Sequence, residues 1–258
     1  MNNLKLATAT HQKAFDLVKK YFEKEERVLA LSLTGSAARN EGSFDSDLDF
    51  DIFFKEGANK DQVISGAEKL LKEEIYSKPK DDIGIYFGVD LHSRKFVIDV
   101  PDRDWTSGPD SFELEIGNTF IYSCLIFERE DSFTKAKERY WPYYDENLRK
   151  TRLNEVLTYC SNNVWHIKPY VKRELYFQAF KRFYDATREF MQALFIAKKT
   201  YPIAYDKWIK KQFVEMLKLP ELYPQFVNLY EVHNLESDEL VKKGSILLQL
   251  VDKYTESI

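Results

Sequence analysis

The pattern of apolar residues changes near Asp131, and this change constrains the fold more than any other feature of the chain. Before it lie short runs typical of buried strands. Residues 28–34 form an apolar run, and residues 48–54 alternate with the period of a strand. After it, apolar residues recur every three or four positions almost to the end, which is the period of a helix. The sequence therefore predicts an α+β region, residues 1–131, followed by an all-helical region, residues 132–258.

The same two periods predict the remaining elements. Further strands are expected at residues 83–89 and 95–100, with a weaker one at 119–128. In the longest expected helix Pro169 suits the first turn, and Ser237 suits the N-cap of the last helix. The expected helices cover residues 14–22, 61–75, 146–166, 169–199, 206–217, 220–232 and 237–255.

Composition excludes several classes of protein. Only Cys124 and Cys160 are present, so neither a disulfide scaffold nor a four-cysteine zinc site is available. The net charge of −4 argues against a nucleic-acid coat, which usually has a basic surplus. No apolar run approaches the roughly 20 residues of a membrane span, and the N-terminus has no apolar stretch typical of a signal peptide. We therefore expect a cytoplasmic protein.

The stretch between the first two strands carries the chemistry. The first strand ends in Gly35-Ser36, and Asp47-Leu48-Asp49 begins the second. Glycine lets a phosphate approach the backbone closely, and serine and the following amides donate to phosphate oxygens. Carboxylates two residues apart on a strand share one face, where a divalent cation would relieve their repulsion. The alternative is a solvated face of an edge strand, which Asp45 and Asp51 would share.

This arrangement resembles the nucleotidyltransferase superfamily related to DNA polymerase β, which includes aminoglycoside and lincosamide nucleotidyltransferases. The resemblance implies an N-terminal mixed sheet with flanking helices, two Mg²⁺ ions, and ATP or another nucleoside triphosphate as co-substrate. It assigns Asp47 and Asp49 as metal ligands. The third ligand would lie in a hydrophobic-acid-hydrophobic step on a later strand, which favours Asp99 in Ile98-Asp99-Val100. Val89-Asp90-Leu91 fits the same step, so both positions stay open.

The same resemblance implies the nucleotide contacts. Gly35 and Ser36 would cradle the phosphates, with Arg39 and Ser46 beside them. The alternative for Arg39 is an ordinary surface arginine.

The helical half resembles the C-terminal half of a group of uncharacterised bacterial nucleotidyltransferase-like proteins. By that likeness Glu174 would be the general base and Lys207 would contact the triphosphate. Asp185 and Glu189 are the next candidates for the base. The alternatives are a glutamate at a helix start and a solvated lysine.

The implied activity is transfer of a nucleoside monophosphate, AMP above all, to a hydroxyl of an aminoglycoside- or lincosamide-type antibiotic, with release of pyrophosphate. Such a reaction would confer antibiotic resistance. A second interpretation is a toxin-like or regulatory transferase acting on RNA or protein. A third is a nucleotide-binding module without turnover, against which the intact aspartates argue. A basic stripe that would favour RNA could come from Lys198, Lys199, Lys207, Lys210 and Lys211.

Overall fold

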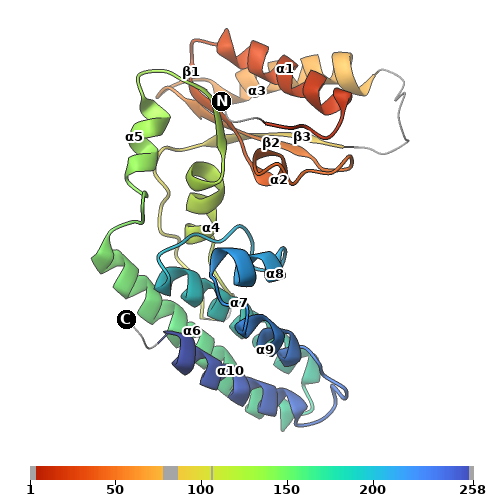
Figure 1. Ribbon diagram of the computed structural model, residues 1–258, viewed down its shortest axis with the longest axis vertical. Coiled ribbons are helices and arrows are strands. Elements are labelled where there is room, and N and C mark those ends of the chain that lie inside the picture. Colours follow the sequence, from red (N-terminus) through yellow and green to blue (C-terminus); the bar gives the residue numbers. More distant parts are fainter. Residues whose placement is uncertain (1–3, 78–86, 106, 256–258) are drawn as a thin grey trace. The chain divides into compact units, whose positions relative to one another are not determined.

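The computed structural model describes residues 4–77, 87–105 and 107–255. The chain divides into two compact units (Figure 1). The first comprises Met1–Ile98 and Gly117–Trp141, and the second comprises Asp99–Ile116 and Pro142–Ile258. Each unit therefore contains two separate pieces of the chain, whereas the sequence pattern suggested one boundary near Asp131.

The first unit is built on a four-stranded mixed sheet with the strand order β3-β2-β1-β4. Strand β1 is antiparallel to both of its neighbours, and β2 is parallel to β3. This mixed sheet and the helical second unit confirm the predicted α+β class, and β1 and β2 lie where the sequence placed them. The strands are β1 (Val28–Leu33), β2 (Leu48–Phe54), β3 (Val89–Arg94) and β4 (Cys124–Glu128).

Helices α1 (Ala9–Glu23) and α3 (Lys60–Leu71) cover one face of this sheet (Figure 1). Leu48 and Phe50 point into the core that these helices form. Successive side chains of a strand alternate between faces, so Asp49 projects from the opposite face. The apolar alternation of β2 therefore leaves its acidic residues on the face away from α1 and α3.

An aromatic cluster occupies part of that second face. Phe53 stacks on Phe96 with ring centroids 4.8 Å apart, and Phe120 and Phe133 pack around it. Phe120 belongs to the π-helical turn η2 (Gly117–Ile121), and Phe133 belongs to α5 (Ser132–Glu138). The cluster buries the far end of β2, so the end nearest Asp47 is the more open one.

Two strand predictions differ from the structure. The strand expected at residues 95–100 is wrong: the third strand is β3, which ends at Arg94. Its parallel partner offers pairing from Leu48 to Phe53 and ends one residue later, so among the described residues the β2–β3 ladder ends at Arg94. The first half of the strand expected at 119–128 is η2, and the second half is β4. The strand expected at 83–89 lies mostly outside the described residues.

The second unit is helical. Helices α6 (Glu146–Val171) and α7 (Tyr176–Ala197) pack along each other, and α10 (Glu239–Thr255) packs against both. Their apolar faces meet around Phe183, Phe190 and Leu247, all fully buried. Shorter elements complete it: α4 (Phe112–Ile116), α8 (Ile209–Lys211), the π-helical turn η3 (Gln212–Met216) and α9 (Leu222–Leu229). None of the helices described is long and apolar enough to cross a membrane.

The single helix expected at residues 169–199 is wrong, because a turn divides it. Pro169 lies in the last turn of α6 rather than in a first turn. Glu174 then has a φ of 57°, its N–H donates to the carbonyl of Val171, and the N–H of Leu175 donates to that of Tyr170. This pair of bonds is a Schellman motif, which ends a helix through one left-handed residue.

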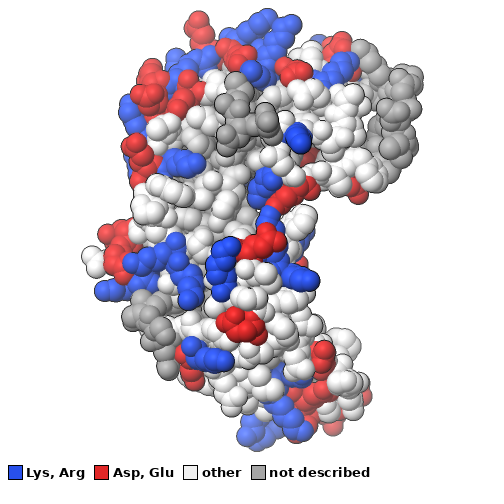
Figure 2. Space-filling view, viewed as in Figure 1, with Lys and Arg blue, Asp and Glu red and all other residues white. Residues whose placement is uncertain are grey.

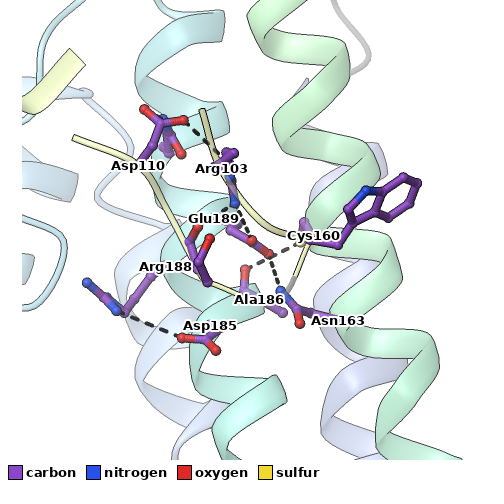
Figure 3. Close-up of polar contacts among 12 residues, drawn as sticks. Arg103, Asp110, Cys160, Asn163, Asp185, Ala186, Arg188 and Glu189 are labelled. Carbon is purple, nitrogen blue, oxygen red and sulfur yellow. Dashed lines mark hydrogen bonds and ion pairs between the residues drawn. The ribbon is translucent and has the colours of Figure 1, made fainter. Parts of the chain in front are cut away.

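Buried ion pairs attach the segment Asp99–Ile116 to the helices of the second unit (Figure 3). Arg103 donates to Glu189 of α7 at 2.6 Å. Arg152 of α6 donates to Asp110 at 2.7 Å and to Glu113 at 2.8 Å. Each of these five side chains is at most 6% exposed. Buried charges are tolerated only when paired in this way, so the network fixes where this segment lies within the unit.

Candidate functional site

The turn after β1 brings Gly35 against Asp49. The N–H of Thr34 donates to the carbonyl of Asp49 at 2.8 Å, which aligns the end of β1 with the start of β2. Gly35 then turns with a φ of +66° and begins the four-residue helix α2 (Gly35–Ala38). A Cβ atom at Gly35 would collide with Oδ2 of Asp49. Both the φ angle and the close approach require glycine, so the Gly-Ser turn and this carboxylate form one local structure.

Asp47 lies at the other side of the same corner. Its Oδ1 accepts a hydrogen bond from the N–H of Gly88, just before β3, and the N–H of Leu48 donates to the Gly88 carbonyl at 3.0 Å. The register of β2 and β3 places Asp90 opposite Asp49 and on the same face of the sheet. Asp47, Asp49 and Asp90 therefore gather where these two parallel strands begin.

The next positions of β3 on this face are the basic residues His92 and Arg94. His92 lies opposite Asp51 in the register, and its Nε2 is 3.9 Å from Oδ1 of Asp49. This is an ion-pair distance, too long for a hydrogen bond. Proximity to Asp49 raises the pKa of His92 above its usual value, against opposing effects of burial and of Arg94.

Asp51 is buried and pairs with Arg94, whose Nε donates to Oδ1 at 2.9 Å. Burial raises the pKa of this carboxyl, while Arg94 and His92 lower it. Asp51 is thus satisfied within the sheet. Of the four aspartates from Asp45 to Asp51 that share one parity, Asp47 and Asp49 are the pair beside the Gly-Ser turn.

Arg39 follows α2 and is half-buried. Its Nε donates to Glu41 at 2.8 Å. Burial lowers the pKa of the guanidinium, and Tyr122 and the Asp49 carboxylate act in the opposite direction. A guanidinium within the field of Asp49 lies where it could also meet a phosphate bound at the turn.

Ser36 and Ser46 have different positions. Ser36 is the second residue of α2, and its carbonyl accepts from the N–H groups of Arg39 and Glu41. The hydroxyl of Ser46 accepts from the N–H of Ser43 at 2.9 Å, which closes the turn that leads to Asp47. Ser46 thus shapes the loop through its side-chain hydroxyl.

Three residues expected at the site belong to the second unit. Asp99 follows β3 and lies on no strand. Glu174 is exposed in the turn between α6 and α7. Lys207 is exposed in the loop before α8, where its carbonyl accepts from Gln212 at 2.9 Å.

The other two candidates for the base, Asp185 and Glu189, lie on α7. Asp185 pairs with Lys181 at 2.6 Å. Glu189 is fully buried and accepts from Arg103 and from Asn163 at 2.8 Å (Figure 3). Burial raises the pKa of Glu189 to about 7, despite both donors.

Sequence reasoning missed the role of β3 in this corner. Asp90, His92 and Arg94 are two residues apart, so a strand over them places all three on one face. That spacing was readable. The sequence prediction instead compared Asp90 and Asp99 by their apolar neighbours alone. It did not consider the β2–β3 register, which places Asp90 beside Asp49.

The corner fits a magnesium ion. Carboxylate oxygens are its preferred protein ligands, and it is usually held by one or two of them together with substrate phosphates. Asp47 and Asp49 supply such a pair, and the missing side chain of Gly35 lets the Asp49 carboxylate lie directly against the turn. Across the described residues, no group of three His, Cys, Asp or Glu side chains is already spaced to hold a metal by itself. The donors thus suit a cation shared with a phosphate ligand.

The sequence of residues 17–96 matches the family described as polymerase beta, nucleotidyltransferase. This range includes the Gly-Ser turn, β2 and β3, so the first unit contains a nucleotidyltransferase domain of the polymerase β type. A nucleotidyltransferase-like protein from Exiguobacterium sibiricum 255-15 is among the similar solved structures. It shares 11% sequence identity over 94% of this chain and 75% of its own, with a TM-score of 0.46. No curated protein matches the chain.

Proposed function

We propose that the protein is a magnesium-dependent nucleotidyltransferase that moves AMP from ATP to a hydroxyl of a small molecule and releases pyrophosphate. One observation carries this proposal: the carboxylate of Asp49 lies directly against the glycine of the Gly-Ser turn. The match of residues 17–96 to the polymerase β nucleotidyltransferase family supports the same reaction.

The residues of the first unit divide the task. Gly35 admits the phosphates close to the backbone, Ser36 donates to their oxygens, and Arg39 offsets their charge. Asp47 and Asp49 would hold Mg²⁺, which when bound neutralises phosphate charge. When protonated, His92 beside Asp49 adds positive charge to the same corner.

We propose Asp90 in place of Asp99 as the third carboxylate. Asp90 lies opposite Asp49 in the β2–β3 register, and Asp99 lies beyond the end of β3. Turnover of Asp90→Asn and Asp99→Asn separates the two. Loss of several orders of magnitude in Asp99→Asn alone would restore the original choice.

The experiment that tests the function is a pair of measurements on the full chain. Thermal melting with Mg²⁺ and each nucleoside triphosphate reports binding, and pyrophosphate release against a panel of hydroxylated antibiotics reports turnover. Asp49→Asn should lose both responses. Asp45→Asn, an exposed carboxylate four residues earlier, is the matched control and should keep them. An Asp49→Asn protein that retained the full Mg²⁺–ATP stabilisation would contradict the proposed site.

The acceptor is proposed as a small hydroxylated antibiotic of the aminoglycoside or lincosamide type. The overall charge of −4 is compatible with a cationic acceptor. On the face shown in Figure 2, basic and acidic side chains of the helical unit are intermixed, which does not favour the phosphate backbone of RNA. A protein or RNA acceptor would instead appear as pyrophosphate release only with those substrates.

A further inference from the structure

His11, in the first turns of α1, lies outside the proposed set of ligands and yet contacts the loop that carries one of them. It is 2% exposed. Its Nε2 is 2.8 Å from the carbonyl oxygen of Ser46, and its Nδ1 is 2.6 Å from the hydroxyl of Thr8. Its ring stacks on Phe87 with centroids 4.2 Å apart. A buried histidine with both nitrogens engaged and one face stacked has a single orientation.

The partners determine which nitrogen carries the proton. A carbonyl oxygen only accepts, so Nε2–H donates to Ser46. Thr8 accepts from the backbone N–H of His11 at 3.2 Å and donates its hydroxyl proton to Nδ1. With a proton on Nε2, the ring satisfies every one of these bonds. The N-cap residue of α1, Thr8, thus helps to orient the ring whose Nε2–H donates to Ser46.

The bond to Ser46 acts on Asp47. The Ser46 carbonyl belongs to the same peptide group as the N–H of Asp47. A hydrogen bond to that oxygen therefore fixes the orientation of the peptide plane that precedes Asp47. On its other side the Asp47 carboxylate is held by Gly88. The segment before α1 makes a second contact nearby, where the N–H of Lys5 donates to Oδ1 of Asn40 at 2.8 Å. The start of the chain thus braces the loop that leads to the metal-binding carboxylates.

We propose that His11 is a positioning residue for nucleotidyl transfer: through the Ser46 carbonyl it holds Asp47 in the orientation that binds Mg²⁺. This inference rests on the proposed function. Groups that orient a metal ligand without touching the metal change affinity or activity by about 10–100-fold when they are removed.

The test uses variants that separate the ring from its hydrogen bond. His11→Phe keeps an aromatic ring against Phe87 and removes the donor to Ser46. His11→Gln supplies an amide N–H at a similar reach. Val18→Ala, in the same helix and 1% exposed, removes core packing while keeping His11, and it is the control for lost stability.

Two measurements follow each variant. Calorimetry gives the affinity for Mg²⁺–ATP, and hydrogen exchange of the metal-free protein reports opening of residues 42–48. In His11→Phe the affinity should fall about 10–100-fold and exchange in that loop should accelerate. His11→Gln should recover part of both, and Val18→Ala should leave both near wild type once melting temperature is accounted for.

The outcomes distinguish this inference from the function on which it rests. If His11→Phe and Val18→Ala weaken binding equally, or if His11→Gln behaves like His11→Phe, the positioning role is wrong. If the wild-type protein binds no Mg²⁺–ATP, the proposed function fails. Loop exchange in the metal-free variants would then still show whether His11 holds the Asp47 loop.

Discussion

At the scale of single residues, Gly35 combines a positive φ with close contact to the Asp49 carboxylate. We expect Gly35→Ala to destabilise the first unit and to abolish stabilisation by Mg²⁺–ATP, because the new Cβ displaces the Asp49 carboxylate. Gly57 also has a positive φ, of +74°, but nothing lies within 4 Å of its Cβ position. Gly57→Ala should therefore cost only about 1 kcal/mol of unfolding free energy. Urea unfolding with and without Mg²⁺–ATP measures both. Equal losses in the two variants would mean that contact with Asp49 is unimportant.

The sequence predicted the Gly-Ser turn and the neighbouring aspartate pair because their signal is local. A Gly-Ser pair and two aspartates two residues apart are visible along the chain, and strand period alone puts the aspartates on one face. The histidines were not identified. His11 and His92 reach the site through the packing of α1 and the β2–β3 register, and neither contact leaves a spacing pattern in the sequence.

At the scale of elements, the turn between α6 and α7 shows what apolar periodicity misses. The period continues through residues 169–199 because both helices bury apolar faces in one core. Glu174 occupies the left-handed position that glycine usually fills, so no glycine marked the break. A left-handed backbone strains a residue with a Cβ, and we expect Glu174→Gly to raise the unfolding free energy by about 0.5–1 kcal/mol while Glu174→Ala leaves it nearly unchanged. Chemical denaturation checks this, and a loss in the glycine variant would contradict it.

The same turn tests the proposed base. Glu174→Gln preserves the size of the side chain, its φ and its exposure while removing the carboxylate. If Glu174 takes the proton of the acceptor, turnover should fall about 10²–10⁴-fold with Mg²⁺–ATP binding unchanged. Pyrophosphate release and calorimetry on one preparation give both quantities. Unchanged turnover would make Glu174 a turn residue only and would direct the search to Asp185.

At the scale of the whole molecule, the sequence predicted the fold class but not how the chain divides between the two units. Strand and helix periods predicted the sheet and the helical unit. The attachment of Asp99–Ile116 to the second unit depends on Arg103, Arg152 and their buried acidic partners. Pairing between residues about 40 to 90 positions apart cannot be inferred from local composition, and charged residues in a loop usually indicate solvent exposure.

The buried pair of Arg103 and Glu189 makes the stability of the second unit depend on pH. Burial raises the pKa of Glu189 from its ordinary value of 4.5 to about 7, so the folded protein binds a proton that the unfolded chain releases. Stability from this group is greatest below about pH 4.5 and falls as pH rises toward 7, by at most about 3 kcal/mol. Three of the four tryptophans, Trp105, Trp165 and Trp208, belong to this unit, so their fluorescence in urea reports its unfolding.

Glu189→Gln should remove this part of the pH dependence, because glutamine keeps the shape and does not titrate. The free energy of unfolding of the wild type minus that of Glu189→Gln should therefore decrease between pH 5 and pH 8. Glu155→Gln, at an exposed position of α6, is the control and should run parallel to the wild type. Other carboxylates titrate over the same range, but they are common to all three proteins and cancel in the differences. A difference that rises with pH would mean that the ion pair with Arg103 outweighs burial, so that Glu189 stays ionised and strengthens the attachment of Asp99–Ile116 throughout.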